Sequence, residues 1–321
     1  MLKLLLILLL SLTGAAQADY SEHPKGKKFI AEMVDKHQLN AAHVTAALKN
    51  ARRNERVLEL IQRPAEKRLQ WKDYRKIFLT DERIDAGVDF WLQHESILTK
   101  AQQQYGVPAS VIVSIIGVET FYGRIRGGFP ALDALSTLAF DYPPRASFFT
   151  SELAQLFLLA EENNLDLTEL EGSYAGAFGM PQFISSSYRA YAVDFDGDQE
   201  HDLWQSVPDV VGSVANYFDR HGWKKNQPVV EQTPVTKAAS KLVVDNPKPS
   251  ISYETLANAE IYPKRKGTGE YSLLKLEAES GVEYWIAHHN FYVITRYNHS
   301  NLYAMAVHEL SQKIKSRKDN R

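Results

Sequence analysis

The sequence predicts a mainly helical (α+β) protein in which a small β-rich segment precedes the last helix. Between about residues 25 and 223, apolar residues recur at helical spacing and are interrupted by Gly and Pro. After residue 223 the composition shifts to Pro, Val and Lys, and two short stretches then alternate in the manner of strands. A chain of 321 residues is long enough for these units to share a sizeable core.

The first residues, MLKLLLILLLSLTGAAQA, have the pattern of a secretory signal peptide. A lysine precedes a Leu/Ile run, and small residues ending in A-x-A follow. We expect cleavage after Ala18 and export to the periplasm, with an uncleaved membrane anchor as the alternative. The chain contains no cysteine, so we expect neither disulfides nor a lipid anchor at the cleavage point. The net charge of -2 argues against nucleic-acid binding, which needs a basic face.

Two helices are well marked in the helical region. Apolar residues at helical spacing begin after Thr80 and end at Gly106, which predicts a C-cap, and Pro108 opens the next helix. That next segment, ASVIVSIIGVETFYG, is apolar nearly all round, which predicts a helix in the centre of the protein. The apolar residues that define the first of the two helices are Ile84, Val88, Trp91, Leu98 and Tyr105.

The last part of the chain predicts strands followed by a helix. The segment YSLLKLEAESGVEYWIAHH indicates two short strands around the turn ESG, and NFYVITRYNHS indicates a third extended segment. The final helix is amphipathic. Its apolar face is formed by Tyr303, Ala306, Val307, Leu310 and Ile314.

Glu119 stands at the end of the apolar helix, and the run before it holds no Lys or Arg to pair with it. On a helix it shares a face with isoleucines of the same run. Apolar burial raises the pKa of a carboxyl group, which suits a general acid that protonates a glycosidic oxygen. The alternative is a glutamate near a helix end that reaches water or pairs with Arg124 or Arg126.

Two further segments have the composition of a sugar-binding surface. In EGSYAGAFGMPQF, glycines let a backbone approach a ligand, aromatic rings stack on sugars, and the Gln182 amide binds hydroxyls and acetamides. A tight turn between helices would explain the glycines but not the aromatic residues Tyr174, Phe178 and Phe183. The segment TRYNHSNLYAMAV has the same character, although tyrosines alone are more often core residues than ligands.

These residues and their surroundings resemble the lytic murein transglycosylase B family, glycoside hydrolase family 103. The resemblance spans most of the chain after the signal peptide. It is densest in VSIIGVETFYGRIRG, LDALSTLAFDYPPRASFF, GSYAGAFGMPQFISSSYRAYAVDFDGD, LWQSVPDVVGSVANYFDRHGW and FYVITRYNHSNLYAMAV.

The resemblance implies a lysozyme-like helical core with an N-terminal helical domain and a small β-rich insertion. It also implies exolytic or endolytic cleavage of the bond between N-acetylmuramic acid and N-acetylglucosamine, with a 1,6-anhydro product. We therefore expect a signal peptide (1–18), an N-terminal helical domain (19–98), a lysozyme-like catalytic core (99–223), a β-rich domain (224–287) and a C-terminal segment (288–321) that completes the core.

By position, the resemblance implies that Glu119 acts as the general acid and then as the general base. The family often has a second Arg directly before Arg145, where this chain has Pro144, so one contact to the glycan or its peptide stem is in doubt. The residues implied to line the glycan groove are Tyr74, Arg145, Ser173, Gln182, Tyr217, Tyr297, Asn298 and Tyr303.

The residue inventory agrees with this mechanism. Hydrolases of glycosidic bonds need two carboxyl groups, whereas the matching apolar segments offer only Glu119. Asp133 and Asp141, the nearest in sequence, have the character of cap or turn residues. A transglycosylase needs no second carboxylate, because the C6 hydroxyl of the substrate attacks in place of water and the 2-acetamido group stabilises the cationic centre.

An acidic loop, DFDGDQEHDLW, predicts a structural calcium site. We expect no cofactor for catalysis. Its four aspartates fall at positions 1, 3, 5 and 9 of an EF-hand-type loop, with the carbonyl of Glu200 at position 7. Gln199 and Gln205 depart from the pattern, because position 6 is usually Gly and position 12 a bidentate Glu. The alternative is a solvated acidic turn. The expected ligands are Asp194, Asp196, Asp198, Glu200 and Asp202.

Two other functions compete with the transglycosylase. A muramidase would hydrolyse the same bond, and a non-catalytic scaffold would bind peptidoglycan without cleaving it. A buried acid at Glu119 counts against the scaffold. The expected partners are peptidoglycan glycan strands, with cell-wall synthesis proteins as further candidates.

Overall fold

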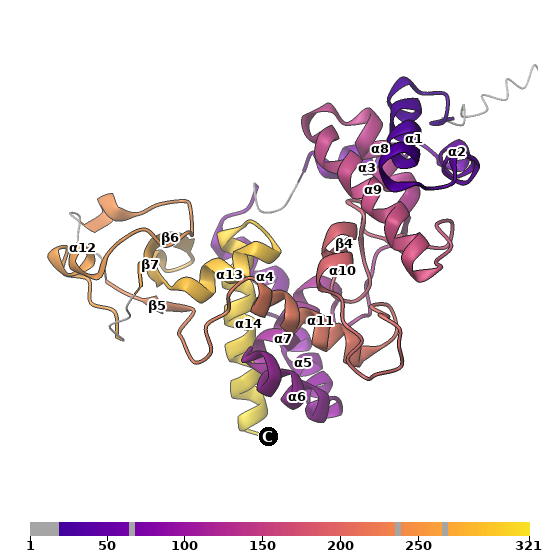
Figure 1. Cartoon of the computed structure of the whole chain (residues 1–321). Coiled ribbons are helices and arrows are strands. Elements are labelled where there is room, and N and C mark those ends of the chain that lie inside the picture. Colours follow the sequence, from indigo (N-terminus) through magenta and orange to yellow (C-terminus); the bar gives the residue numbers. More distant parts are fainter. Residues whose placement is uncertain (1–18, 64–67, 235–238, 265–268) are drawn as a thin grey trace, which may run out of the picture.

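The computed structural model describes residues 19–63, 68–234, 239–264 and 269–321, and the expected signal peptide lies outside these ranges. Over the described residues the protein is mainly helical, as predicted, and forms three lobes (Figure 1). None of the described helices is both long enough and apolar enough to cross a membrane.

The central lobe is built around helix α7. Helix α14 packs along α7, α5 and α4, and α11 packs against α6 and α7. Because neighbours enclose α7 on several sides, its nearly uniform apolar surface is buried. The helices of this lobe are α4 (Trp71–Phe78), α5 (Asp81–Gln93), α6 (Glu95–Tyr105), α7 (Ala109–Thr120), α11 (Val207–Arg220), α13 (His289–Tyr297) and α14 (Asn301–Asp319).

A second, wholly helical lobe lies at the upper right of Figure 1. Helices α8 and α9 pack on each other, α1 packs on α2 and α9, and α3 packs on α8. Helix α10 connects this lobe with α11. The helices are α1 (Pro24–His37), α2 (Ala41–Asn50), α3 (Glu55–Ile61), α8 (Ala131–Asp141), the 3-10 turn η2 (Pro143–Arg145), α9 (Ala146–Asn163) and α10 (Ser185–Tyr191).

Two small antiparallel sheets complete the fold. One is a meander of two-residue strands in the order β1-β2-β3-β4, and the other has the order β5-β7-β6 and forms the third lobe with α12. The elements are β1 (Phe129–Pro130), β2 (Glu171–Gly172), β3 (Ala177–Phe178), β4 (Phe183–Ile184), β5 (Val230–Gln232), η3 (Ala239–Leu242), α12 (Tyr253–Asn258), β6 (Ser272–Ala278) and β7 (Gly281–Ala287).

Most predicted elements are confirmed. Gly106 ends α6 with a left-handed φ of 72°, and Pro108 precedes α7. Strands β6 and β7 pair around the predicted turn, and the predicted apolar face of α14 is fully packed. The helix expected from Thr80 to Tyr105 is instead two helices, because His94 leaves the helical conformation and α6 turns toward α11 while α5 stays on α14.

The prediction of an extended segment at NFYVITRYNHS is wrong, because this segment forms α13. Its β-branched residues favour strands only weakly, and burial overrides such a preference. Phe291, Val293 and Ile294 are fully buried, and the helix packs against α14 and β7.

The domain boundaries expected near residues 223 and 287 fall between elements, after α11 and after β7. The boundary expected after residue 98 falls inside α6. Helices α4 and α5, which precede it, pack with the central lobe, whereas α8 and α9, which follow it, pack with α1 and α3. Spatial neighbours therefore do not follow chain order in this part of the molecule.

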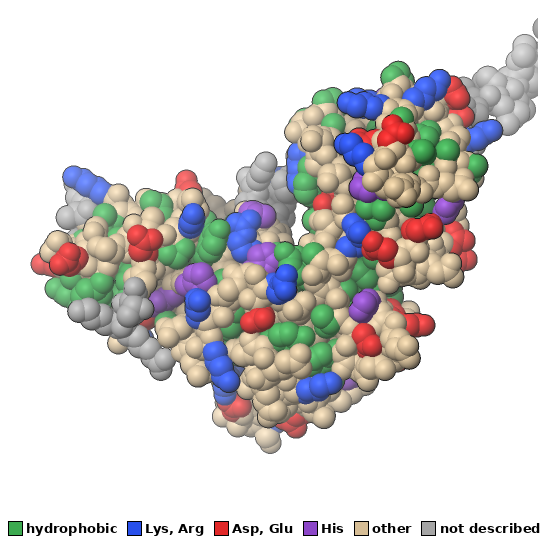
Figure 2. Space-filling view, in the orientation of Figure 1, with side chains coloured by type: hydrophobic (Ala, Val, Ile, Leu, Met, Phe, Trp, Pro, Cys, Tyr) green, Lys and Arg blue, Asp and Glu red, His purple; other side chains and the backbone are tan. Residues whose placement is uncertain are grey.

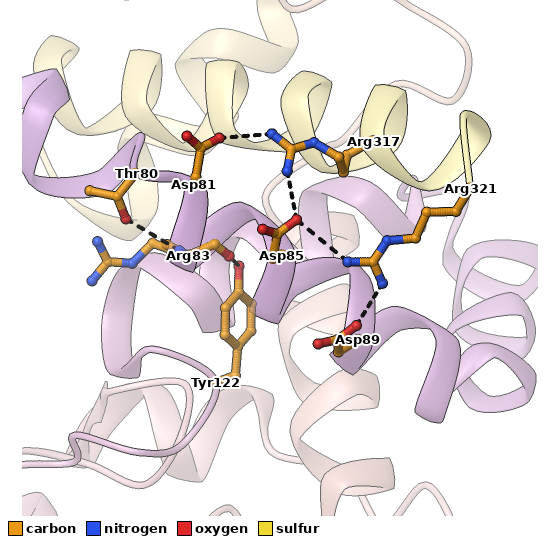
Figure 3. Close-up of polar contacts among 8 residues, drawn as sticks. All are labelled: Thr80, Asp81, Arg83, Asp85, Asp89, Tyr122, Arg317 and Arg321. Atoms are coloured by element: carbon orange, nitrogen blue, oxygen red, sulfur yellow. Dashed lines mark hydrogen bonds and ion pairs between the residues drawn. The ribbon is translucent and has the colours of Figure 1, made fainter.

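The C-terminal end of α14 is attached to α5 by exposed ion pairs (Figure 3). Arg317 contacts Asp81 at 2.8 Å and Asp85 at 2.6 Å, and Arg321 contacts Asp89 at 2.7 Å. Exposed pairs of this kind are screened by salt and stabilise weakly. The buried apolar face of α14 is the stronger attachment.

Candidate functional site

Glu119 lies in the last turn of α7, and it is the one residue of this helix that is not buried. The isoleucines on its face, Ile112, Ile115 and Ile116, have no exposed surface. The side chain of Glu119 is therefore partly exposed at the C-terminal end of an otherwise buried apolar helix. The space-filling view shows the surface hollowed between the wholly helical lobe and the other two (Figure 2).

Tyr303, from the first turn of α14, holds the carboxyl group of Glu119. Its hydroxyl donates a hydrogen bond to Oε1 of Glu119 at 2.5 Å. Burial, and then the charge of Glu119, raises the pKa of Tyr303 well above its usual range. The hydroxyl therefore keeps its proton and remains a donor to Glu119 across the working pH range.

Other predicted aromatic residues surround this pair. The ring of Tyr297 is stacked on that of Tyr303 at 6.4 Å, and it lies 4.8 Å from the ring of Tyr217. Burial, and then the charge of Glu119, raises the pKa of Tyr297, and Tyr74 is among the groups that raise the pKa of the buried Tyr303. Four tyrosines from α4, α11, α13 and α14 thus converge near Glu119.

Gln182 and Ser173 lie in the glycine-rich meander and are held by backbone contacts. The amide of Gln182 donates to the carbonyl of Arg126 at 3.1 Å and to that of Gly179 at 3.0 Å. The hydroxyl of Ser173 accepts from the backbone N–H groups of Ala175 and Ala177. Both contacts fit a tight turn. The link from Gln182 to Arg126 also ties the meander to the loop after Glu119.

Arg145 and Asn298 lie at the edge of the site. Arg145 is exposed in η2, with its guanidinium 4.3 Å from the ring centre of Phe148. Asn298 ends α13, and its carbonyl accepts from Ser300 at 2.7 Å. The hydroxyl of Tyr303 reaches Glu119 directly.

Sequence reasoning missed a hydrogen-bonded Arg–His pair beside Asn298. Arg296 is hydrogen-bonded to His299, and its carbonyl accepts from the hydroxyl of Tyr217 at 2.5 Å. Burial lowers the pKa of His299, and the charges of Arg296 and Arg145 lower it further. Arg145 is therefore close enough in space for its charge to act on His299, although the two lie on different lobes. Both residues of the pair lie in the segment TRYNHS. Arg145 is far from this segment in the sequence, so no local pattern indicates that its charge acts on His299.

The chain turns sharply directly after Glu119 and Thr120. Phe121, Tyr122 and Gly123 follow in the left-handed region with φ of 50°, 60° and 84°. For residues other than glycine this conformation costs on the order of 1–3 kcal/mol each. The hydroxyl of Thr120 donates to the carbonyl of Met180 at 2.8 Å and accepts from the N–H of Gly123 at 3.0 Å. Strained residues of this kind cluster at functional sites, which supports Glu119 as a candidate functional residue.

The two other carboxylates considered in the sequence lie in the helical lobe. Asp133 accepts from the backbone N–H of Arg52 at 2.8 Å, and Asp141 accepts from the hydroxyl of Tyr20 at 2.6 Å. Both residues lie within α8 and link it to the N-terminal residues, so neither is the cap or turn residue that the sequence suggested.

The acidic loop brings three of its four predicted aspartate ligands together. Carboxylate oxygens of Asp194, Asp196 and Asp198 lie within 4.8 Å of one another. The carboxylate of Asp202 is not part of this group, and its Oδ1 instead accepts from the N–H groups of Trp204 and Gln205. Like charges this close repel unless a cation lies among them, and hard oxygen donors suit calcium. The residues present therefore fit a calcium ion.

The end of the acidic loop contacts the segments that follow Glu119, which the sequence did not indicate. The backbone carbonyl of Leu203 accepts from the N–H of Met180 at 2.9 Å, and the backbone carbonyl of Trp204 accepts from the guanidinium of Arg126 at 2.5 Å. Met180 and Arg126 in turn contact Thr120 and Gln182. A cation bound in the loop would stabilise a neighbour of the site without touching Glu119.

Comparison with known proteins identifies relatives of nearly the whole chain. A family model described as the transglycosylase SLT domain matches residues 21–312. The membrane-bound lytic murein transglycosylase B of Escherichia coli (strain K12) is 41% identical over 307 residues, which cover 92% of this chain and 84% of that protein.

Solved structures of similar proteins share the fold. The soluble lytic transglycosylase SltB1 from Pseudomonas aeruginosa is 45% identical, with a TM-score of 0.87 over 92% of this chain and 100% of that one. The Escherichia coli lytic transglycosylase Slt35 in complex with calcium is 41% identical, with a TM-score of 0.86 over 94% and 96%. SltB3 from Pseudomonas aeruginosa, in complex with NAG-anhNAM-pentapeptide, is 27% identical, with a TM-score of 0.77 over 91% and 79%.

Proposed function

The chain belongs to the transglycosylase SLT domain family and is a lytic murein transglycosylase acting on peptidoglycan, and we propose that Glu119 is its single catalytic carboxyl group. The observation that carries this proposal is the hydrogen bond from Tyr303 to Glu119 at the open end of an otherwise buried helix. A binding protein would gain nothing from an acid held in this way.

In the proposed mechanism, protonated Glu119 donates its proton to the oxygen that leaves from N-acetylmuramic acid. The 2-acetamido group of the substrate stabilises the cationic centre that forms at C1. Glu119 then takes the proton of the C6 hydroxyl as that oxygen attacks C1, which closes the 1,6-anhydro ring. The attacking hydroxyl is already held by the sugar ring, so no second carboxylate is needed to activate water.

We assign the glycan contacts to the residues predicted from the sequence. Tyr297 is partly exposed and presents aromatic surface next to Glu119, whereas Tyr303 is almost fully buried and contributes its hydroxyl. Pro181, the residue before Gln182, accepts at its carbonyl from the hydroxyl of Tyr297 at 2.6 Å, which places Gln182 close to this ring. Arg145, whose charge helps to lower the pKa of His299 after burial and Arg296, suits an anionic part of the substrate such as the carboxylates of a peptide stem. The SltB3 complex contains a sugar with such a stem, which supports this assignment.

The remaining members of the predicted glycan set are Tyr74, Ser173, Tyr217 and Asn298. Tyr74 and Tyr217 are almost fully buried, so we propose that they shape the site from behind. The hydroxyl of Tyr217 donates to the backbone carbonyl of Arg296 and so helps to hold the end of α13.

The identity of the product tests this mechanism. Mass spectrometry of muropeptides released from purified peptidoglycan should show products lighter than hydrolysed ones by one water, about 18 Da, because the C6 oxygen replaces water as the nucleophile. Reducing-end products would instead identify a muramidase. Binding without any product would identify a scaffold.

We further propose that the acidic loop holds a structural calcium ion between Asp194, Asp196 and Asp198, and that the carbonyl of Glu200 and the carboxylate of Asp202 complete its ligands. The relative Slt35 was solved with calcium, which supports the ion. The ion would neutralise the charge of the loop and stabilise the segment that contacts Met180 and Arg126. It takes no part in the reaction.

Removal of calcium is expected to lower the melting temperature. An ion at about 100 times its Kd stabilises the folded state by about 3 kcal/mol, which corresponds to a shift of several degrees. Scanning calorimetry in chelator and in calcium measures the shift, and Asp196→Asn should abolish it. An unchanged melting temperature after thorough chelation would indicate an acidic turn without an ion.

We place the protein in the periplasm, where its substrate lies. The evidence for this location is the signal-peptide pattern that ends at Ala18, so N-terminal sequencing of the exported protein tests it. Partners among cell-wall synthesis proteins remain candidates for co-purification.

A further inference from the structure

The side chain of Tyr122 is inserted between two helices next to the catalytic residue. A Cβ atom at Gly117 of α7 would lie 2.6 Å from the hydroxyl of Tyr122, and one at Gly87 of α5 would lie 2.4 Å from it. Glycine at both positions therefore makes room for the ring. The hydroxyl donates to the carbonyl of Arg83 at 2.8 Å (Figure 3). Burial raises the pKa of this hydroxyl, so it stays a donor.

The side chain of Arg83 binds the same turn from the opposite direction. Its Nε donates to the carbonyl of Gly117 at 3.1 Å, and Nη1 donates to the carbonyl of Ile77. The guanidinium carbon lies 4.7 Å from the ring centre of Phe121, which is one of the two strained residues. A cation at the last carbonyls of α7 is also favoured by the helix dipole.

These contacts anchor the chain on both sides of Glu119. Arg83 holds the carbonyl two residues before it, and Tyr122 lies three residues after it with its ring against α5. Between the anchors, the left-handed residues Phe121 and Tyr122 would relax toward an ordinary conformation if released. A shift of this turn would carry the carboxyl group of Glu119 away from Tyr303.

We propose that Arg83 and Tyr122 are positioning residues that fix the orientation of the Glu119 carboxyl group. They act through the backbone of the last turn of α7, and Gly87 and Gly117 provide the space that the ring of Tyr122 requires. This inference rests on the proposed catalytic role of Glu119. It adds α5 to the elements on which turnover depends.

Tyr122→Phe tests the proposal, because it removes the hydroxyl and keeps the ring. Misplacement of a catalytic group by about 1 Å costs up to roughly 10²-fold, so we expect kcat on soluble peptidoglycan fragments to fall about tenfold with little change in KM. Arg83→Lys, which keeps the charge but loses the two-pronged contact, should have the same effect. Tyr20→Phe is the matched control, because it removes a buried tyrosine hydroxyl bonded to Asp141 in the helical lobe.

The control separates positioning from stability. We expect Tyr20→Phe to lower the melting temperature without changing kcat, and Tyr122→Phe to lower kcat at temperatures where it is fully folded. Wild-type kcat in a folded Tyr122→Phe would overturn the proposal, as would equal losses of kcat in both tyrosine variants. Wild-type protein and Glu119→Gln assayed alongside test the proposed function separately, since its failure would appear in those two samples.

Discussion

Replacement of Glu119 by glutamine is expected to lower the turnover of peptidoglycan by about 10³-fold, in the range that general acid–base catalysis contributes. An amide can neither donate an acidic proton to the leaving oxygen nor accept one from the C6 hydroxyl. The fold should persist, because glutamine has nearly the same shape and its oxygen can still accept from Tyr303. The rate of muropeptide release measures the effect, and thermal unfolding verifies the fold.

Asp133→Asn provides the matched control for this prediction. Asp133 is a partly buried carboxylate in the helical lobe, where it accepts from the backbone of Arg52, and burial raises its pKa. We expect this variant to turn over peptidoglycan at the wild-type rate. Substantial turnover in Glu119→Gln, or a comparable loss in Asp133→Asn, would contradict a mechanism with one carboxyl group at Glu119.

Acidification from pH 6.5 to about pH 4 is expected to destabilise the protein through His308 of α14. Burial lowers the pKa of its imidazole from 6.5 to about 4, and among the described residues Nδ1 has no hydrogen-bond partner. In this interval the unfolded chain binds a proton that the folded chain does not. The stabilisation from a neutral His308 is therefore complete above pH 6.5 and lost by about pH 4, and it amounts to about 3 kcal/mol.

His308→Gln should flatten this part of the pH dependence, because glutamine does not titrate. Denaturant unfolding at pH 7.5 and pH 4.5 gives the free energy of unfolding of each protein. His43→Gln, at an exposed position on α2, is the control and should behave like the wild type. If His308→Gln lost as much stability as the wild type between these pH values, the acid sensitivity would arise elsewhere.

The helices and the β-hairpin were predictable because their signals are local. Thr80 caps α5 through its side chain, Gly106 ends α6 in a left-handed conformation, and the alternation of β6 and β7 surrounds a turn. The prediction at residues 290–300 was wrong because α13 is decided by burial against α14 and β7 rather than by the strand preference of its β-branched residues.

The candidate site was predictable in its residue types but not in its geometry. An acid at the end of an apolar run and aromatic residues among glycines indicated carbohydrate chemistry. The hydrogen bond from Tyr303 to Glu119 joins residues separated by 184 positions, and no local pattern indicates such a contact. The roles of Arg83 and Tyr122 were invisible for the same reason.

By itself, the sequence determined that α7 is a central helix with an acid at its end, that four aspartates share one loop, and that the protein is mainly helical. Periodicity and composition act over a few residues, so a single segment is enough to reveal them. Only the tertiary structure decided which tyrosine contacts Glu119, which carboxylates of the loop converge, and how α5 contacts the turn after Glu119. These features depend on contacts between distant segments, which exist only once α14, α5 and α7 have packed together.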